Sequence, residues 1–142
     1  MNKIGLKDLI LSPRNIYNAI YALRSYVFEK GLMTESDLEA IHAKLMTAVP
    51  GIDKIYHCSK REYEHSFMRK PSIGMAIQAR REHPGLRLKE CVMVGDSMTD
   101  MLFGRRAGMT TVLVGDNSDC ATAKPWLVDY RYKDLFDFAR SL

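Results

Sequence analysis

The chain has 142 residues, of which 46% are apolar and 27% charged, a composition ordinary for one soluble globular domain. Charges break every long apolar stretch within a few residues, so the sequence predicts no membrane-spanning helix and no signal peptide. The net charge of +4 comes from basic pairs that are spread among acids, without a recognition motif for nucleic acid around them. These features argue against a membrane or nucleic-acid partner and favour a site for small anions.

The cysteines exclude two further classes of protein. Cys58, Cys91 and Cys120 are far apart, odd in number and form no C-x-x-C pair. Such a set indicates neither a disulfide framework nor a zinc ribbon. A reducing, cytoplasmic location fits this usage best.

The first third of the chain is predicted to be helical scaffold. A short apolar run at Leu6–Leu11 has the length of a brief strand, and no carboxylate follows it. Apolar residues at helical spacing then predict a helix from Pro13 to about Lys30. Thr34–Asp37 resembles a capping box and predicts the start of the next helix. The residues expected on its buried face are Leu38, Ile41, Leu45 and Val49.

The middle of the chain predicts a strand, a loop and a helix. Alternation from Ile52 to Cys58 predicts the strand, and the polar Lys60–Met68 predicts the loop. Pro71 favours a first helical turn, which displays Lys70 at a loop-to-helix junction where backbone amides favour an anion. A lysine at this place also fits an ordinary exposed charge. The helix is expected to bury Ile73, Ala76 and Ile77 and to stop at Pro84.

The most informative stretch is Cys91–Asp100, with the sequence CVMVGDSMTD. Apolar residues run into Gly95, and Asp96 and Asp100 follow, which predicts a buried strand ending in a loop that opens a helix. Ligands of open α/β sheets bind at the carboxyl ends of the strands, and carboxylates there are suitable ligands for Mg²⁺. Asp and Ser after Gly also form ordinary helix caps, so the stretch alone fits either role.

The remaining chain predicts a continuation of the same sheet. Thr110–Val114 is a second strand of the buried type, so Cys91–Gly115 is expected to form a βαβ unit with parallel strands. Leu127–Tyr130 is expected to be a last short strand, followed by a closing amphipathic helix. The residues expected to face inward are Met98, Met101 and Leu102 in the crossover helix, and Leu135 and Phe138 in the closing helix.

These motifs resemble the haloacid dehalogenase (HAD) superfamily of phosphohydrolases. The residues that carry the resemblance are Arg69–Met75, Val94–Met101, Gly104–Met109 and Thr111–Val114. Within the superfamily, Gly31–Glu35 and Ile55–Cys58 are similar to the branch of histidinol-phosphate phosphatases and heptose bisphosphate phosphatases. The similarity covers about residues 31–140, and it implies a single Rossmann-like α/β domain over 1–142, with a parallel sheet flanked by helices.

The resemblance also implies a chemistry. In the family, an aspartate in a D-x-D-x-T motif attacks phosphorus, a lysine stabilises the phosphoryl charge and a late acidic motif holds Mg²⁺. It implies that Lys70 is this lysine, that Asp96 is the Mg²⁺ ligand, and that Asp100 is a supporting acid that orients Lys70 or the metal's water shell. The implied substrate is a small phosphorylated metabolite such as a sugar phosphate or histidinol phosphate.

The sequence departs from the family pattern before Lys70. No D-x-D-x-T occurs, since Asp8, Asp37 and Asp53 do not follow an apolar strand, and the threonine of the family's second motif is also missing. The branch often carries a zinc loop, but only Cys58 of its ligands is present, and one ligand cannot make a tetrahedral site. No zinc is expected. The other ligand positions hold Lys60, Ser66 and Met68.

The missing motif also has a structural consequence, because the family's first two strands are missing or replaced. In the family's sheet, the first strand lies between the strand that ends here at Gly95 and the predicted strand that contains Ile55. A gap at that place leaves buried backbone groups unpaired, which costs about 1–3 kcal/mol for each group. Either Leu6–Leu11 fills the place, or another chain does, or the chain is a fragment or an internally deleted gene product, which we favour. An unfilled sheet also makes pairing into a homo-oligomer attractive.

Three functions remain open at this point. Hydrolysis needs an aspartate supplied from outside this sequence. A non-catalytic relative holds phosphate, Mg²⁺ or a partner with the same residues, whereas a structural remnant has no ligand. The only candidate loop for substrate choice, Ser59–Met68, is too short and too altered to specify the substrate.

Overall fold

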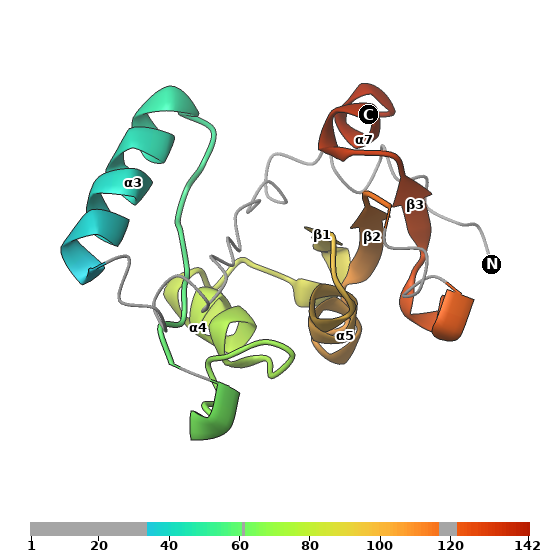
Figure 1. The fold of residues 1–142 in the computed structure, drawn as a ribbon, viewed down its shortest axis with the longest axis horizontal. Helices are drawn as coiled ribbons and strands as arrows, with labels where there is room; N and C mark the ends of the chain where they lie inside the picture. Colours follow the sequence, from blue (N-terminus) through green and yellow to red (C-terminus); the bar gives the residue numbers. More distant parts are fainter. Residues whose placement is uncertain (1–33, 61, 117–121) are drawn as a thin grey trace.

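The computed structural model describes residues 34–60, 62–116 and 122–142, which form a parallel sheet packed against helices (Figure 1). Within these residues the sheet has three strands in the order β1-β2-β3. The predicted α/β class is confirmed. The strands are β1 (Val92–Gly95), β2 (Thr110–Val114) and β3 (Tyr130–Tyr132), and the helices are α3 (Glu35–Ala48), α4 (Gly74–Glu82), α5 (Met98–Arg106) and α7 (Leu135–Arg140). None of these helices is long and apolar enough to cross a membrane.

The predicted βαβ unit is confirmed. Val92 pairs with Thr110 in a parallel register, and α5 connects the two strands. A Cβ atom on Gly104 would lie 2.7 Å from Met93 Cβ and 2.8 Å from Thr111 Cγ2, so α5 lies too close to the sheet for a larger residue. Phe103, which the sequence analysis did not single out, is fully buried beside this crossing.

Two apolar clusters fill the described core, and α5 contributes a residue to each: Phe103 to the first and Met101 to the second. The second cluster contains Met101, with Met98 and Leu102 partly buried against it, as their helical spacing predicts. The first cluster joins α4 to β1 and contains Tyr56, Met75, Ala76, Ala79, Leu86, Cys91, Met93, Phe103 and Met109.

Helix α3 begins as predicted but packs less than predicted. Thr34 and Asp37 form the capping box, with the Asp37 amide 3.2 Å from Thr34 Oγ1. Of the expected buried face only Leu38 is buried; Ile41 is 38% exposed and Val49 is 45% exposed. Figure 1 shows α3 at one end of the molecule and the sheet toward the other, and no residue of α3 belongs to the two core clusters of the described residues.

The segment from Ile52 to Cys58 was wrongly predicted as a strand. It has no strand assignment, because a strand needs a hydrogen-bonded neighbour and no described strand pairs there. Tyr56 is nevertheless buried, and its hydroxyl donates a hydrogen bond of 2.8 Å to Glu82 of α4. The alternating pattern of Ile52–Cys58 therefore reflects side-chain packing and not hydrogen bonding to a neighbouring strand.

The C-terminal predictions were displaced by a few residues. Pro125–Leu127 is a 3-10 helix, and β3 begins only at Tyr130. Proline at the start of this turn has no amide to donate to a ladder, which moves the strand along the chain. Phe138 of α7 is buried as expected, but Leu135 is 61% exposed. The expectations for Leu6–Leu11 and for the helix from Pro13 lie outside the described residues.

Candidate functional site

The candidate site lies where β1 ends and α5 begins. Asp96 and Ser97 follow Gly95, and Ser97 is the N-cap of α5. The Asp100 amide donates to Ser97 Oγ at 3.3 Å, and the Ser97 amide donates to Asp100 Oδ2 at 3.2 Å. Ser97 and Asp100 thus form a capping box, which is the helix-cap role that the sequence analysis gave as one of two for this stretch. The cap fixes the Asp100 carboxylate at the carboxyl edge of the sheet.

A lysine 30 residues earlier in the chain meets this carboxylate. Lys70 Nζ donates to Asp100 Oδ1, and the side chains are only 10% and 8% exposed. The Ser97 hydroxyl donates to the other carboxylate oxygen at 2.7 Å. The structure therefore brings together two of the three predicted site residues, and Lys70 is not the exposed charge that was the plainer alternative.

Gly95 makes room for this arrangement. A Cβ atom on Gly95 would lie 2.4 Å from Asp100 Cβ and 2.6 Å from Asp100 Oδ2. Side-chain atoms do not approach so closely, so any larger residue would displace the Asp100 carboxylate. The glycine of the G-D-x-x-x-D motif is required by the close approach of the second aspartate.

The segment that carries Lys70 is a turn. Helix α4 begins at Gly74, three residues later than the proline-based prediction, because amide groups here close turns: Ser72 donates to the Arg69 carbonyl at 3.0 Å. The Gly74 amide donates to Phe67 O at 3.1 Å, and a Cβ on Gly74 would lie 2.4 Å from that oxygen. The Lys70–Pro71 peptide is cis.

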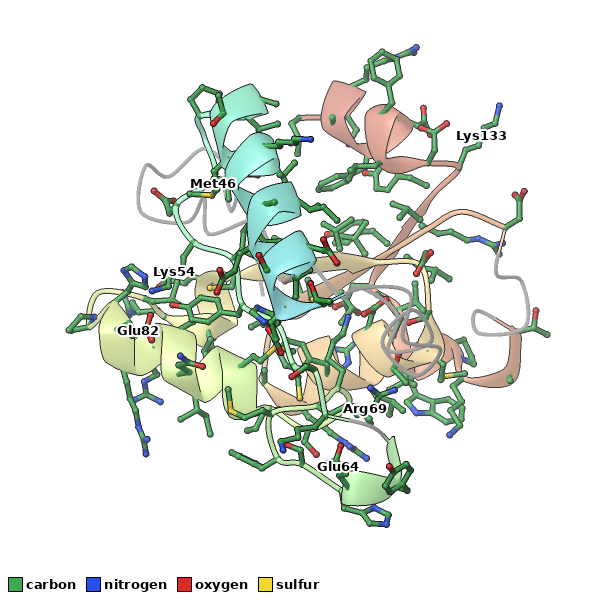
Figure 2. The ribbon with its side chains drawn as sticks, turned by 60° about the vertical axis from the view of Figure 1, so that its left-hand side comes forward. Met46, Lys54, Glu64, Arg69, Glu82 and Lys133 are labelled. Carbon is green, nitrogen blue, oxygen red and sulfur yellow. The ribbon has the colours of Figure 1, made fainter. Side chains whose placement is uncertain are left out.

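Arg69, the neighbour of Lys70, contacts the preceding loop. Its guanidinium donates to the Lys60 carbonyl at 3.0 Å, which ties the loop to the turn before α4. Figure 2 shows Arg69 close to the loop that bears Glu64. These contacts hold the turn that carries Lys70 against the preceding loop.

Asp96 is the third predicted residue, and its side chain is exposed at the same edge. Both Asp100 oxygens accept hydrogen bonds, and Asp96 lies on the exposed side of the same turn, where a carboxylate can meet a cation from solvent. Among the described residues, no group of three or more His, Cys, Asp or Glu side chains could hold a metal. A site with Asp96 as its protein ligand fits Mg²⁺, because this ion binds proteins through one or two carboxylates and keeps waters or phosphate oxygens as its other ligands.

The positions of the branch's zinc loop are closed by hydrogen bonds. Cys58 Sγ lies 4.0 Å from Ser66 Oγ, and the Met68 amide donates to the same hydroxyl at 3.2 Å. The side chains at two of the branch's ligand positions are therefore a hydroxyl, Ser66, and a thioether, Met68. The absence of zinc remains a prediction.

A second carboxylate network, which the sequence analysis missed, lies at the amino ends of β2 and β3. Asp129 accepts hydrogen bonds from the Thr111 amide and from Arg105, both at 2.9 Å. Burial raises the pKa of Asp129, but these hydrogen bonds outweigh it and hold the pKa below its ordinary value. The network joins α5, β2 and the segment before β3, and its sequence signal is weak because the residues are far apart.

Comparisons with known proteins agree with the geometry. The HAD-hydrolase-like family model matches residues 67–135, which include Lys70, Asp96 and Asp100. D-glycero-beta-D-manno-heptose-1,7-bisphosphate 7-phosphatase of Helicobacter pylori (strain ATCC 700392 / 26695) is 24% identical over 142 residues, covering 96% of this chain and 82% of that protein. The corresponding alpha-anomer phosphatase of Campylobacter jejuni is 38% identical over 63 residues, covering 44% of this chain and 35% of that protein.

A solved structure is also similar. The D,D-heptose 1,7-bisphosphate phosphatase from B. bronchiseptica, complexed with magnesium and phosphate, superposes with a TM-score of 0.70 and 27% identity, covering 84% of this chain and 70% of that one. The family model, the relatives and the solved structure together support a phosphohydrolase-like chain of the HAD superfamily. Within the superfamily, its similarity is to the heptose bisphosphate phosphatase branch.

Proposed function

We propose that this chain binds Mg²⁺ together with the phosphoryl group of a small phosphomonoester at the carboxyl end of β1. The observation that carries the proposal is the buried ion pair of Lys70 and Asp100, which lies beside the exposed Asp96. Lys70 would donate to a phosphoryl oxygen, Asp96 would ligate the metal, and Asp100 would hold Lys70 in place.

The geometry of Lys70 supports this division of roles. An ammonium group has three N–H donors, and within the described part of the chain Lys70 donates one of them to Asp100. Hydrogen bonds from a charged donor to phosphate are stronger than neutral ones, and low exposure strengthens them further. A lysine with a fixed direction also loses less side-chain entropy when it meets an anion. Bound Mg²⁺ would supply further positive charge against the phosphoryl oxygens.

The relatives support a proposal for the substrate class. The H. pylori and C. jejuni proteins are named as phosphatases of heptose 1,7-bisphosphates, and the solved neighbour holds magnesium and phosphate. We therefore propose a phosphorylated sugar as the ligand of this chain. Histidinol phosphate is the alternative that the sequence resemblance left open.

Calorimetry with inorganic phosphate tests the proposal. Phosphate is titrated with and without MgCl₂ into the unmodified chain, Asp96→Asn and the control Asp53→Asn, which alters another exposed aspartate. We expect Mg²⁺-dependent binding in the unmodified chain and the control, and at least tenfold weaker binding in Asp96→Asn. Equal affinity in all three proteins, or no binding in any, contradicts the proposal.

Hydrolysis is the second candidate function, because all the named relatives are phosphatases. Against it, the chain contains no D-x-D-x-T to supply the aspartate nucleophile of the family. Loss of a nucleophile leaves only a small fraction of an enzyme's rate. Phosphate release from sugar phosphates and histidinol phosphate, measured with Mg²⁺, decides between the two. Turnover that disappears in Asp96→Asn reveals a working phosphatase; binding without turnover reveals a non-catalytic relative.

A further inference from the structure

The hydroxyl of Thr99 is the exposed end of a series of hydrogen bonds that leads to Lys70. Thr99 Oγ1 lies 2.9 Å from Ser97 Oγ, which lies 2.7 Å from Asp100 Oδ2. The other carboxylate oxygen of Asp100 accepts a hydrogen bond from Lys70 Nζ. Thr99 is exposed in the first turn of α5, whereas Asp100 is buried. The series therefore connects the surface of the candidate site to its buried ion pair.

The direction of each hydrogen bond follows from the charge of Asp100. Its carboxylate is paired with the ammonium group of Lys70, and an ionised carboxylate only accepts hydrogen bonds. Ser97 must therefore donate its single hydroxyl proton to Asp100, so that Ser97 Oγ only accepts at its other contacts. One of these donors is the Asp100 amide, at 3.3 Å, and the other is the Thr99 hydroxyl. The hydroxyl proton of Thr99 is thereby directed to Ser97.

The Thr99 oxygen keeps its acceptor capacity for a ligand. A hydroxyl oxygen has two lone pairs, and within residues 34–60, 62–116 and 122–142 the Thr99 hydroxyl is hydrogen-bonded only to Ser97. The phosphoryl group of a monoester is mainly a dianion at neutral pH, and its oxygens are then acceptors. It does not match an oxygen whose own proton is engaged. A hydroxyl group of the ligand does match it, because a hydroxyl group can donate.

We propose that Thr99 accepts a hydrogen bond from a hydroxyl group of a phosphorylated sugar and so selects ligands that carry hydroxyl groups. This inference rests on the proposed function, in which Lys70 and a Mg²⁺ ion at Asp96 hold the phosphoryl group. Asp96 and Thr99 are both exposed where β1 ends and α5 begins. One ligand can therefore meet the charged groups with its phosphoryl end and Thr99 with its sugar end.

Calorimetry with two matched ligands in the presence of Mg²⁺ tests this proposal. Both are phosphonates, in which a methylene group replaces the bridging oxygen, so that hydrolysis does not interfere. One is the analogue of mannose 6-phosphate, and the other is the analogue of cyclohexylmethyl phosphate, which has a six-membered ring without hydroxyl groups. Thr99→Val should weaken binding of the mannose analogue by about three- to tenfold, which corresponds to one neutral hydrogen bond. It should change the affinities for the cyclohexyl analogue and for inorganic phosphate by less than about twofold.

Two further variants make the result specific to the Thr99 oxygen. Thr99→Ser keeps the hydroxyl group and should retain the affinity for the mannose analogue. Thr47→Val is the matched control, because it removes the hydroxyl group of another exposed helical threonine, which donates to the Ala43 carbonyl at 2.9 Å. It should leave all the affinities unchanged. Thermal unfolding of each variant verifies that it folds, as expected for substitutions at exposed side chains.

The possible outcomes distinguish this inference from the proposed function. Equal losses for both analogues in Thr99→Val show that Thr99 only positions Ser97 and the ion pair, and they overturn the inference. An unchanged affinity for the mannose analogue overturns it as well. The phosphonate analogue of histidinol phosphate offers N–H donors in place of the sugar, and a loss confined to that ligand contradicts the choice of a hydroxyl group. In these three cases Mg²⁺-dependent phosphate binding persists. Its absence from the unmodified chain contradicts the proposed function and this inference together.

Discussion

Asp100 and Asp129 have the same kinds of partner but lie at opposite ends of the sheet. Each accepts hydrogen bonds from a hydroxyl-bearing residue and pairs with one basic side chain. The Asp129 pair with Arg105 is half-exposed, with side chains 33% and 40% accessible, whereas the Asp100 pair with Lys70 is nearly buried. Asp129 lies before β3, and Asp100 lies beyond the end of β1.

The difference in position and exposure between the two networks separates one that stabilises the fold from one that is a candidate site. Asp129 links three segments through Thr111 and Arg105, and the Thr111 hydroxyl donates to Leu127 O at 2.6 Å, so its partners are all parts of the fold. At the carboxyl end the buried pair lies next to the exposed Asp96, where ligands of α/β sheets bind. A paired carboxylate alone does not indicate function; its place on the sheet and its neighbours do.

The largest expected effect comes from breaking the buried pair. Lys70→Met leaves the Asp100 charge buried without its cation, and such losses cost about 3–5 kcal/mol. Urea unfolding of the variant measures this change. The double variant Lys70→Met, Asp100→Leu should recover much of the stability, because it removes both charges. If Lys70→Met alone is as stable as the unmodified chain, the pair is not buried as described.

Gly95→Ala should have the next largest effect. The new methyl group overlaps the Asp100 carboxylate, and such overpacking costs about 1–3 kcal/mol. We also expect weaker Mg²⁺-dependent phosphate binding, because Lys70 loses its orienting partner. Gly85→Ala is the matched control, since a Cβ there meets nothing within 4 Å. Equal unfolding and binding curves for the two variants would remove the role given to Gly95.

Asp129→Asn should destabilise the fold by about 1–2 kcal/mol at pH 7, because the ionised carboxylate accepts from both Arg105 and Thr111. The pKa of Asp129 is lowered from 3.8, so its stabilisation is present above that pH and is lost as the pH falls through the lower, folded-state value. The difference between the variant and the unmodified chain should therefore shrink below about pH 4. Urea unfolding at several pH values measures it, and phosphate binding at pH 7 should not change.

The smallest effects concern the two capping boxes. Thr34→Ala should cost about 1 kcal/mol of stability and leave phosphate affinity unchanged, because its box caps only α3. Ser97→Ala removes a similar cap and also a hydrogen bond to Asp100, so it should lower phosphate affinity as well. Thermal unfolding and calorimetry on both variants compare the two boxes. A similar loss of phosphate affinity in both would contradict a special role for the Ser97 box.

The sequence predicted well wherever local pattern and long-range packing agree. The β-branched run at Thr110–Val114 and the strand, loop and helix after Cys91 appear at the expected places, because the two strands of this βαβ unit follow one another in the chain and pair with each other. The Ile52–Cys58 strand failed for the opposite reason, since pairing requires a neighbour that the local sequence cannot supply.

Candidate-site residues showed the same division. Asp96 and Asp100 were identified from their spacing and Lys70 from its motif. The family resemblance gave a contact of Asp100 with Lys70 as one of two alternatives, but no sequence pattern decides between them across 30 residues. The burial of Phe103 and the tie between Thr111 and Asp129 were missed for the same reason. Contacts between distant segments depend on how α5 crosses the sheet.

The most direct test of the account is a two-dimensional NMR titration of the ¹⁵N-labelled chain with inorganic phosphate in the presence of Mg²⁺. We predict that the amide signals of Lys70, Asp96 and Ser97 shift in a saturable, Mg²⁺-dependent way, while those of Thr111 and Asp129 stay in place. Shifts centred on Thr111 and Asp129, or no saturable shift at Lys70 and Asp96, would contradict the assignment of the binding site to the carboxyl end of β1.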